Sequence, residues 1–239
     1  MNLNLTPKTI FKKLSLFVVF MTLANLIGIT IQLFPGHGRF YYLISLFDFN
    51  GEYNIPALYS SLTLIFSALL LAIIAMKHKK IGSSYIPWLG LAIIFVFLSV
   101  DEMTSLHEQL TGPVQQSLNT SGLFYYAWVI PYTVALGIFV TLYFRFLMRL
   151  PKRTRSLFIV SGVIFIFGAI GFELLGGLQD SLHGSTNLLY RLLFTCEEFL
   201  EMFGIVVFIY ALFDYMITEF GFLKVIIDRS KTERSLKRI

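Results

Sequence analysis

Six long apolar stretches constrain the fold of this chain more than any other feature of its sequence. The hydrocarbon core of a bilayer is about 30 Å thick, and a helix needs about 20 apolar residues to cross it. Backbone polar groups in lipid must be satisfied within the segment, so such stretches cross as helices. We therefore predict an all-α polytopic membrane protein, a six-transmembrane-helix bundle that forms a single domain over residues 1–239. The expected spans lie near residues 14–34, 57–76, 86–106, 123–148, 157–178 and 190–220.

The composition agrees with this prediction. The chain is 56% hydrophobic and 14% charged, whereas soluble domains carry about 25% charged residues. A single cysteine, Cys196, excludes an internal disulfide, and no Cys/His cluster indicates a structural zinc site.

Lys and Arg gather on one side of the expected membrane. With six spans both chain ends share a side, and all of the 19 basic residues except Arg39 and Arg191 fall there. Loops rich in Lys and Arg stay in the cytoplasm. We therefore predict cytoplasmic N- and C-termini, a basic cytoplasmic tail at 224–239, and location in a bacterial cytoplasmic (inner) membrane.

This placement also accounts for the net charge of +5. The basic residues border the spans and follow no nucleic-acid recognition module, so we expect membrane lipids as partners and no nucleic acid. A lipid or small-molecule substrate is an open alternative, and the sequence makes no prediction of oligomeric state.

The acidic residues are divided as unevenly as the basic ones. Ten of the 14 Asp and Glu fall on the outer loops or the outer ends of spans. Acidic residues contribute little to membrane topology, so this bias needs another cause. The ten are Asp48, Glu52, Asp101, Glu102, Glu108, Glu173, Asp180, Glu197, Glu198 and Glu201.

Helical spacing indicates which acids of the last two spans face other helices. In span five Glu173 shares a face with the seven-spaced small residues Gly162, Ala169 and Gly176. We therefore expect Glu173 to lie at a contact between helices.

In span six Glu197, Gly204 and Ala211 form a second seven-spaced line, with Glu201 between the first two. Glu198 lies about 100° further round the helix and is a weaker candidate.

The stretch "FLSVDEMTSLHEQL" at 97–110 ends span three with a dense group of titratable residues. Glu102 follows Ser99 by three residues and is the expected inward-facing acid, whereas Asp101 shares a face with Glu108. If the helix continues, His107 and Glu108 stand one to two turns above Glu102.

Carboxylates gathered in a low dielectric cannot all ionise unless a cation joins them. We therefore predict a divalent metal ion at the outer leaflet, with Zn, Mn, Fe or Ca suited to carboxylate and imidazole ligands. Glu108 or Asp101 would act as the catalytic general base on a metal-bound water. The predicted metal ligands are Glu102, His107, Glu173, Glu197 and Glu201.

Simpler interpretations stay open. Residues 101–108 and 197–201 are also typical of exposed helices at the membrane surface, and Glu173 could serve only as a hydrogen-bonding group between helices. The sequence contains none of the three motifs H-x3-H, E-x2-H and E-E-x3-R. Sequence motifs therefore do not assign this chain to a family.

Three function classes follow from these alternatives. The first is a metal-dependent membrane hydrolase acting on a lipid or lipid-linked substrate. The second is a cation- or proton-coupled small transporter, whose inward polar steps would be Thr22, Asn25, Thr63, Ser67 and Asp214. The third is a non-catalytic membrane subunit or sensor.

Overall fold

The computed structural model describes residues 6–34, 41–51 and 53–221. The predicted basic tail at 224–239 and Glu52 lie outside the described residues. Within the described ranges the regular structure is helical, without strands, and six helices are long and apolar enough to cross a membrane. The predicted all-α bundle of six spans is therefore confirmed.

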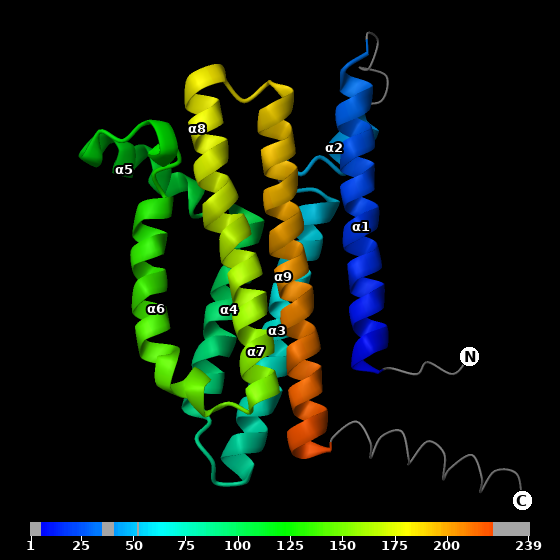
Figure 1. Cartoon of the computed structure of the whole chain (residues 1–239), viewed down its shortest axis with the longest axis vertical. Coiled ribbons are helices and arrows are strands. Elements are labelled where there is room, and N and C mark those ends of the chain that lie inside the picture. The colour runs from blue at the N-terminus through cyan, green and yellow to red at the C-terminus, as the bar shows by residue number, and fades with distance from the viewer. Residues whose placement is uncertain (1–5, 35–40, 52, 222–239) are drawn as a thin grey trace, which may run out of the picture.

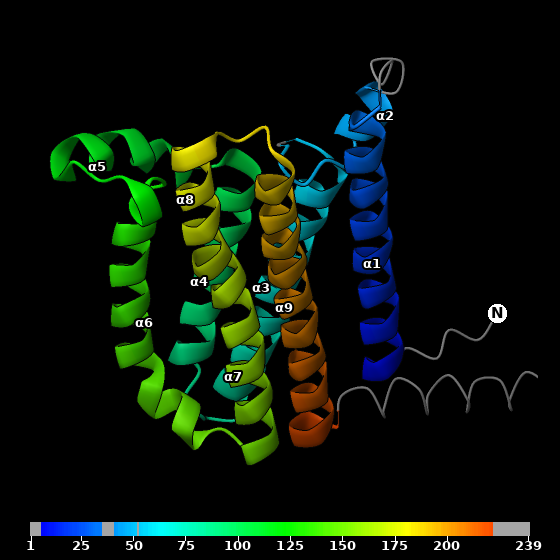
Figure 2. The same ribbon diagram turned by 45° about the horizontal axis from the view of Figure 1, so that its top comes forward.

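The six spanning helices are joined by short helices and turns (Figure 1). Two short helices, α2 (Tyr41–Ser45) and α5 (Thr111–Leu118), lie between spans, and α5 projects sideways beyond the bundle (Figure 2). The spanning helices are α1 (Pro7–Gln32), α3 (Ile55–Lys80), α4 (Ile86–Thr104), α6 (Val129–Arg149), the continuous helix Lys152–His183, and α9 (Leu188–Phe220).

Several helices begin directly after a residue whose side chain caps the helix, and not at the first residue of the apolar stretch. Thr6, Asn54 and Asn187 each accept a hydrogen bond from the backbone N–H three residues further on, at the starts of α1, α3 and α9. Such caps satisfy donors that a helix start leaves unpaired. The first span therefore begins at Pro7, seven residues before the expected boundary near residue 14.

The ends of the third and fourth spans also differ from the prediction. α4 ends at Thr104 instead of residue 106, because Ser105 adopts a left-handed conformation (φ 48°) and its N–H bonds to the carbonyl of Asp101 at 2.7 Å. The fourth span begins at Val129 instead of residue 123. Two 3₁₀ turns and α5 occupy the segment between them.

α9 is the central helix of the bundle and contacts α1, α3, α7 and α8. Its inner face includes Met202, Ile209 and Leu212, which are fully buried. Asn25 of α1 also joins the two helices, because its side-chain amide donates to the Thr195 hydroxyl of α9 at 2.8 Å. α6, in contrast, is not packed into the core of the bundle. Val129 is its only buried residue in the described part of the chain.

Two glycines allow the fifth and sixth spans to approach closely. A Cβ on Gly204 of α9 would lie 2.9 Å from the backbone nitrogen of Phe165, and one on Gly168 would lie 2.9 Å from the carbonyl oxygen of Glu197. The prediction that Gly204 faces another helix is confirmed. The predicted seam through Gly162 is wrong, because a Cβ there would meet no atom within 4 Å.

A π-helical turn explains how Glu173 still faces α9. The fifth span consists of α7 (Lys152–Ile166), the π-helical turn η4 (Phe167–Phe172) and α8 (Glu173–His183). In a regular α-helix the face of Gly168 would next present Phe172. The π-helical turn inserts one residue, so Glu173 takes that place.

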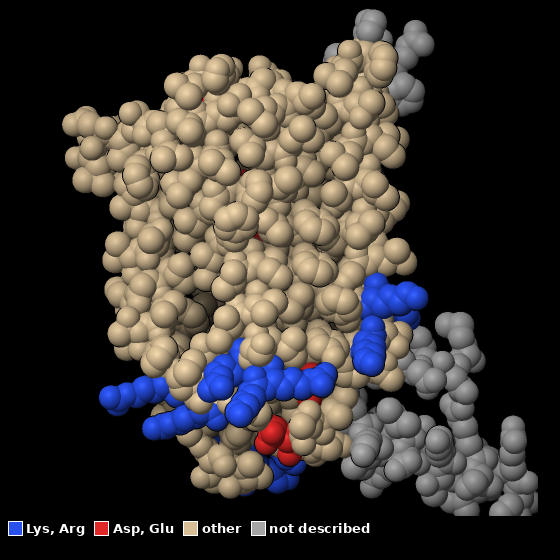
Figure 3. Space-filling view, viewed as in Figure 1, with Lys and Arg blue, Asp and Glu red and all other residues tan. Residues whose placement is uncertain are grey.

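The described Lys and Arg residues, except Arg191, lie at one end of the bundle, which we call the basic end (Figure 3). α1 begins and α9 ends there, so both ends of the described chain lie on the same side, as predicted (Figures 1 and 2). We call the opposite end, where α4 ends and α9 begins, the acidic end.

Replacing Gly204 with alanine should weaken the contact between α7 and α9. The new Cβ would press on the backbone of Phe165, which cannot move aside as a side chain can. We expect the free energy of unfolding in detergent micelles to fall by about 1–3 kcal/mol. Gly162→Ala is the matched control, because its Cβ meets open space. Equal stability of the two variants would contradict the packing described above.

Candidate functional site

Seven of the ten acidic residues singled out from the sequence line a single cavity of about 1160 Å³. Its walls come mainly from α4, α6, the fifth span and α9. All five predicted metal ligands and both predicted catalytic residues line it, and Glu198 joins them. The titratable residues of this site are Asp101, Glu102, His107, Glu108, Glu173, Glu197, Glu198 and Glu201.

The cavity continues from these acids toward the basic end between apolar walls. Phe139 and Leu147 of α6, Phe158 of α7 and Phe208 of α9 lie along this deeper part. No described Lys or Arg lines the cavity. The surface is hollowed between α6 and α7 (Figure 3), on the side where α6 stands away from the bundle. A region with acids at one end and apolar walls elsewhere suits an amphiphilic molecule.

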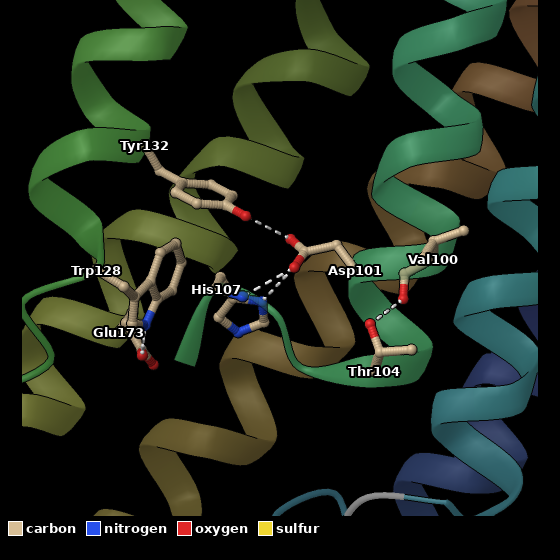
Figure 4. Close-up of polar contacts among 7 residues, drawn as sticks. All are labelled: Val100, Asp101, Thr104, His107, Trp128, Tyr132 and Glu173. Carbon is tan, nitrogen blue, oxygen red and sulfur yellow. Dashed lines mark hydrogen bonds and ion pairs between the residues drawn. The ribbon is translucent and has the colours of Figure 1, made fainter. Parts of the chain in front are cut away.

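The turn after α4 folds His107 back onto Asp101 (Figure 4). Oδ1 of Asp101 lies 3.3 Å from Nδ1 of His107 and accepts the backbone N–H of His107 at 2.9 Å. The Tyr132 hydroxyl donates to Oδ2 of Asp101 at 3.1 Å. The helix does not continue far enough to lift His107 above Glu102, because the left-handed Ser105 ends it.

Asp101 orients the ring of His107. With Nδ1 at the carboxylate, Nε2 points away from Asp101 (Figure 4). The rings of Trp128 and Tyr132 lie with their centroids 4.5 Å and 6.1 Å from that of His107. In the neutral form of the ring, such an arrangement leaves Nε2 available as a ligand or proton acceptor.

The charges around His107 favour its protonated form. Burial alone would lower the pKa of His107, but the hydrogen bond and charge of Asp101, together with the charges of Glu108 and Glu173, outweigh it. The pKa of His107 is therefore raised above its usual value.

Glu173 and Glu197 are the two buried glutamates of the acidic group, with 7% and 6% of their surfaces exposed. Oε1 of Glu173 accepts the indole N–H of Trp128 at 2.7 Å (Figure 4). The carboxyl groups of Glu173 and Glu197 are also in hydrogen-bonding contact. Two unit charges about 4 Å apart repel by about 4 kcal/mol at an effective dielectric constant of about 20. A proton or a cation is therefore required between them.

Oε2 of Glu197 is buried and receives no hydrogen bond within the described part of the chain. Glu102, Glu198 and Glu201 are half-buried, because they face the cavity rather than protein atoms. Across the described residues no three His, Cys, Asp or Glu side chains are already placed to hold one metal ion. An ion at Glu173 and Glu197 would require a third glutamate to turn toward them.

A second polar group closes the rim at the acidic end. The Tyr126 hydroxyl donates to Oδ2 of Asp180 at 2.7 Å and lies 2.9 Å from the Tyr190 hydroxyl. Burial, together with the bonds to Tyr190 and Asp180, raises the pKa of Tyr126. These bonds tie the segment before α6 to α8 and α9, so they fix the position of Trp128 two residues later.

The alternative of exposed helices is wrong for Asp101 and Glu197, which are 4% and 6% exposed. Helical spacing predicts Glu102 as the inward acid, yet Asp101, which shares a face with Glu108, is the more buried of the two neighbours. Asp214 lies apart from the cavity, where Arg153 pairs with it at 2.8 Å.

The sequence reasoning missed Trp128 and Tyr132 as partners of the acids. Both were part of, or next to, a stretch of aromatic residues that is also typical of a membrane interface. Their spacing of four residues at the start of a helix was the available signal, since it places both rings on one face.

Comparison with known proteins gives a family but no function. A protein family described as "Domain of unknown function (DUF8692)" matches residues 13–216, which include all six spans in whole or in large part. No curated protein and no solved structure matches the chain.

The raised pKa of His107 should make stability depend on pH. A raised folded-state pKa stabilises the fold below the usual value of about 6.5, and this contribution is lost as the pH rises through the folded-state value. We expect the parent protein to be more stable than His107→Gln at about pH 6, and the difference to shrink toward about pH 9. Thermal unfolding in micelles measures it.

The control for this experiment is His183→Gln, which removes an exposed histidine at the end of α8. A difference between parent and His107→Gln that stays constant over this pH range would show that Asp101 does not hold a charged His107.

Proposed function

The chain belongs to this family of unknown function, and we propose from the geometry of its cavity that it is a divalent-metal-dependent membrane hydrolase. Its substrate is a lipid or a lipid-linked molecule. One observation carries the proposal. Carboxylates from α4, α8 and α9 lie together at one end of a cavity whose other walls are apolar.

The charges of the cavity support a bound cation. Seven carboxyl groups line it, and the described residues supply no Lys or Arg to balance them. The contact between Glu173 and Glu197, and the unpaired Oε2 of Glu197, mark where positive charge is most needed. Oxygen ligands with one imidazole favour Zn, Mn, Fe or Ca.

The site divides its residues between holding the ion and moving protons. Glu102, Glu173, Glu197 and Glu201 would hold the ion, and Nε2 of His107 faces away from Asp101 and could join them. A metal ion of this kind lowers the pKa of a bound water and polarises a carbonyl or phosphoryl group.

Asp101 serves the proposed reaction best as the group that orients His107, because both of its oxygens already accept hydrogen bonds. Glu108, next to His107 in the chain and exposed at the cavity, is then the general base.

The transporter alternative receives less support from the contacts of the polar residues. The Thr63 and Ser67 hydroxyls donate to carbonyls of their own helix, and Asp214 pairs with Arg153. The deep end of the cavity is lined by aromatic and aliphatic side chains, among them Phe146 and Leu147. A path for ions would need polar groups there.

Metal analysis tests the proposal directly. The purified parent protein should contain stoichiometric Zn, Mn, Fe or Ca, and Glu173→Gln and Glu201→Gln should lose most of it. Each substitution removes one charge while keeping the shape of the side chain. Glu219→Gln is the matched control, because Glu219 is exposed at the other end of α9.

Metal in the parent protein would then be followed by turnover of a total lipid extract, analysed by mass spectrometry with and without a chelator. A parent protein that contains no metal after purification without chelators would contradict the proposed hydrolase.

We also propose that the basic end faces the cytoplasm of a bacterial inner membrane, because Lys and Arg are retained on that side. Single cysteines can test this in a Cys196→Ser background. Ser185→Cys, in the turn before α9, should react with an impermeant maleimide in intact cells. Ser83→Cys, in the turn after α3, should react only after permeabilisation. The reverse pattern would invert the orientation.

A further inference from the structure

The cavity carries information on the charge of the molecule that it binds. Its lining contains seven carboxyl groups and one imidazole, that of His107. Carboxyl groups therefore outnumber basic side chains in the described lining by seven to one. An anionic head group such as a phosphate would meet repulsion here, because the described lining offers no Lys or Arg.

The surroundings of the acids suit a protonated amine. The rings of Trp128 and Tyr132 lie 5.1 Å apart and stand beside the carboxylates of Glu173 and Asp101. Aromatic faces and carboxylates together stabilise an ammonium group. Oε2 of Glu197 is a buried acceptor without a donor, so it supplies a partner for an incoming N–H.

The cavity is long enough to hold a lipid chain. Its lining along α6 runs from Pro131 to Leu147, which at about 1.5 Å per residue is about 24 Å. Half of the hydrocarbon core of a bilayer is about 15 Å thick. The volume of about 1160 Å³ also exceeds the range of about 300–1,000 Å³ that is usual for pockets of small ligands.

α6 is fastened to α4 near both of its ends. Near the acidic end the Tyr132 hydroxyl bonds to Asp101, and near the basic end the Tyr143 hydroxyl bonds to the carbonyl of Pro87 at 3.3 Å. Between these points the surface is hollowed on the side of α7 (Figure 3). A chain in the bilayer could enter there without crossing a polar surface.

We propose that the cavity binds a single-chain amphiphile with a protonated amine in its head group, which enters from the bilayer between α6 and α7. The amine lies among Glu173, Glu197 and the ring of Trp128, and the chain lies along α6. This inference rests on the proposed function only for the location of the head group, because binding requires neither metal nor turnover.

The test is binding of hexadecylamine to the purified protein in lipid nanodiscs. The Trp88→Phe background leaves Trp128 as the only tryptophan, and its emission reports on the acidic end of the cavity. Hexadecanol and hexadecyl phosphate have the same chain and replace the amine with a neutral or an anionic group. We expect hexadecylamine to bind at least about tenfold more tightly than either.

Two pairs of variants separate specific binding from partition into lipid. Gly162→Leu places a side chain in the apolar part of the cavity. Its control, Gly137→Leu, places one on the outward side of α6. At both positions a Cβ would meet no atom within 4 Å. Glu197→Gln removes a charge at the head group, whereas Glu219→Gln removes one outside the cavity. Gly162→Leu and Glu197→Gln should lose most of the affinity for hexadecylamine. Gly137→Leu and Glu219→Gln should keep it.

Equal affinity for the amine and the alcohol, or full binding by Gly162→Leu, would overturn the proposal. All titrations are run with a chelator and again with added Mn²⁺. Amine binding in a protein without metal would support this inference while the proposed hydrolase fails. Metal binding without preference for the amine would leave the hydrolase standing and refute the inference.

Discussion

The close approach of the fifth and sixth spans is the contact on which the site depends. Gly168 and Gly204 let the two helices meet backbone to backbone, and the π-helical turn then rotates Glu173 toward Glu197. This brings two carboxyl groups together in a buried position, which costs free energy unless a proton or cation lies between them. Such a pair therefore does not by itself contribute to stability. Buried, like-charged groups of this kind are typical of functional sites.

The position of α6 turns this acidic contact into a cavity. α9 is covered by α1, α3 and the fifth span, whereas α6 stands off and keeps most of its side chains partly exposed. Hydrogen bonds from Tyr132 and Tyr143 hold it near its two ends. The space behind it joins the carboxylates to an apolar wall, so polar chemistry and a hydrocarbon chain can be held side by side. This combination is what an enzyme or binding protein for membrane-dissolved amphiphiles needs.

Periodicity predicted the inward faces of Glu173, Glu197 and Glu201 because a helix repeats its faces over short distances in sequence. It failed where the helix was irregular. The line through Gly162, Ala169 and Glu173 assumed regular turns, whereas the contact runs through Gly168 and the π-helical turn brings Glu173 onto that face. Helical spacing gave Glu102 as the inward acid and grouped Asp101 with Glu108, yet Asp101 is buried and the turn at Ser105 brings His107 to its carboxylate.

The sequence by itself determined the six spans, the shared side of the two chain ends and the separation of basic from acidic residues. These depend on hydrophobic length and on the order of charges along the chain, which are local properties. Only the tertiary structure decided which acids meet, which of them are oriented by aromatic partners, and that an apolar cavity adjoins them. Those outcomes depend on one left-handed residue, one inserted helical residue and contacts between helices far apart in sequence, and none of these leaves a repeating pattern.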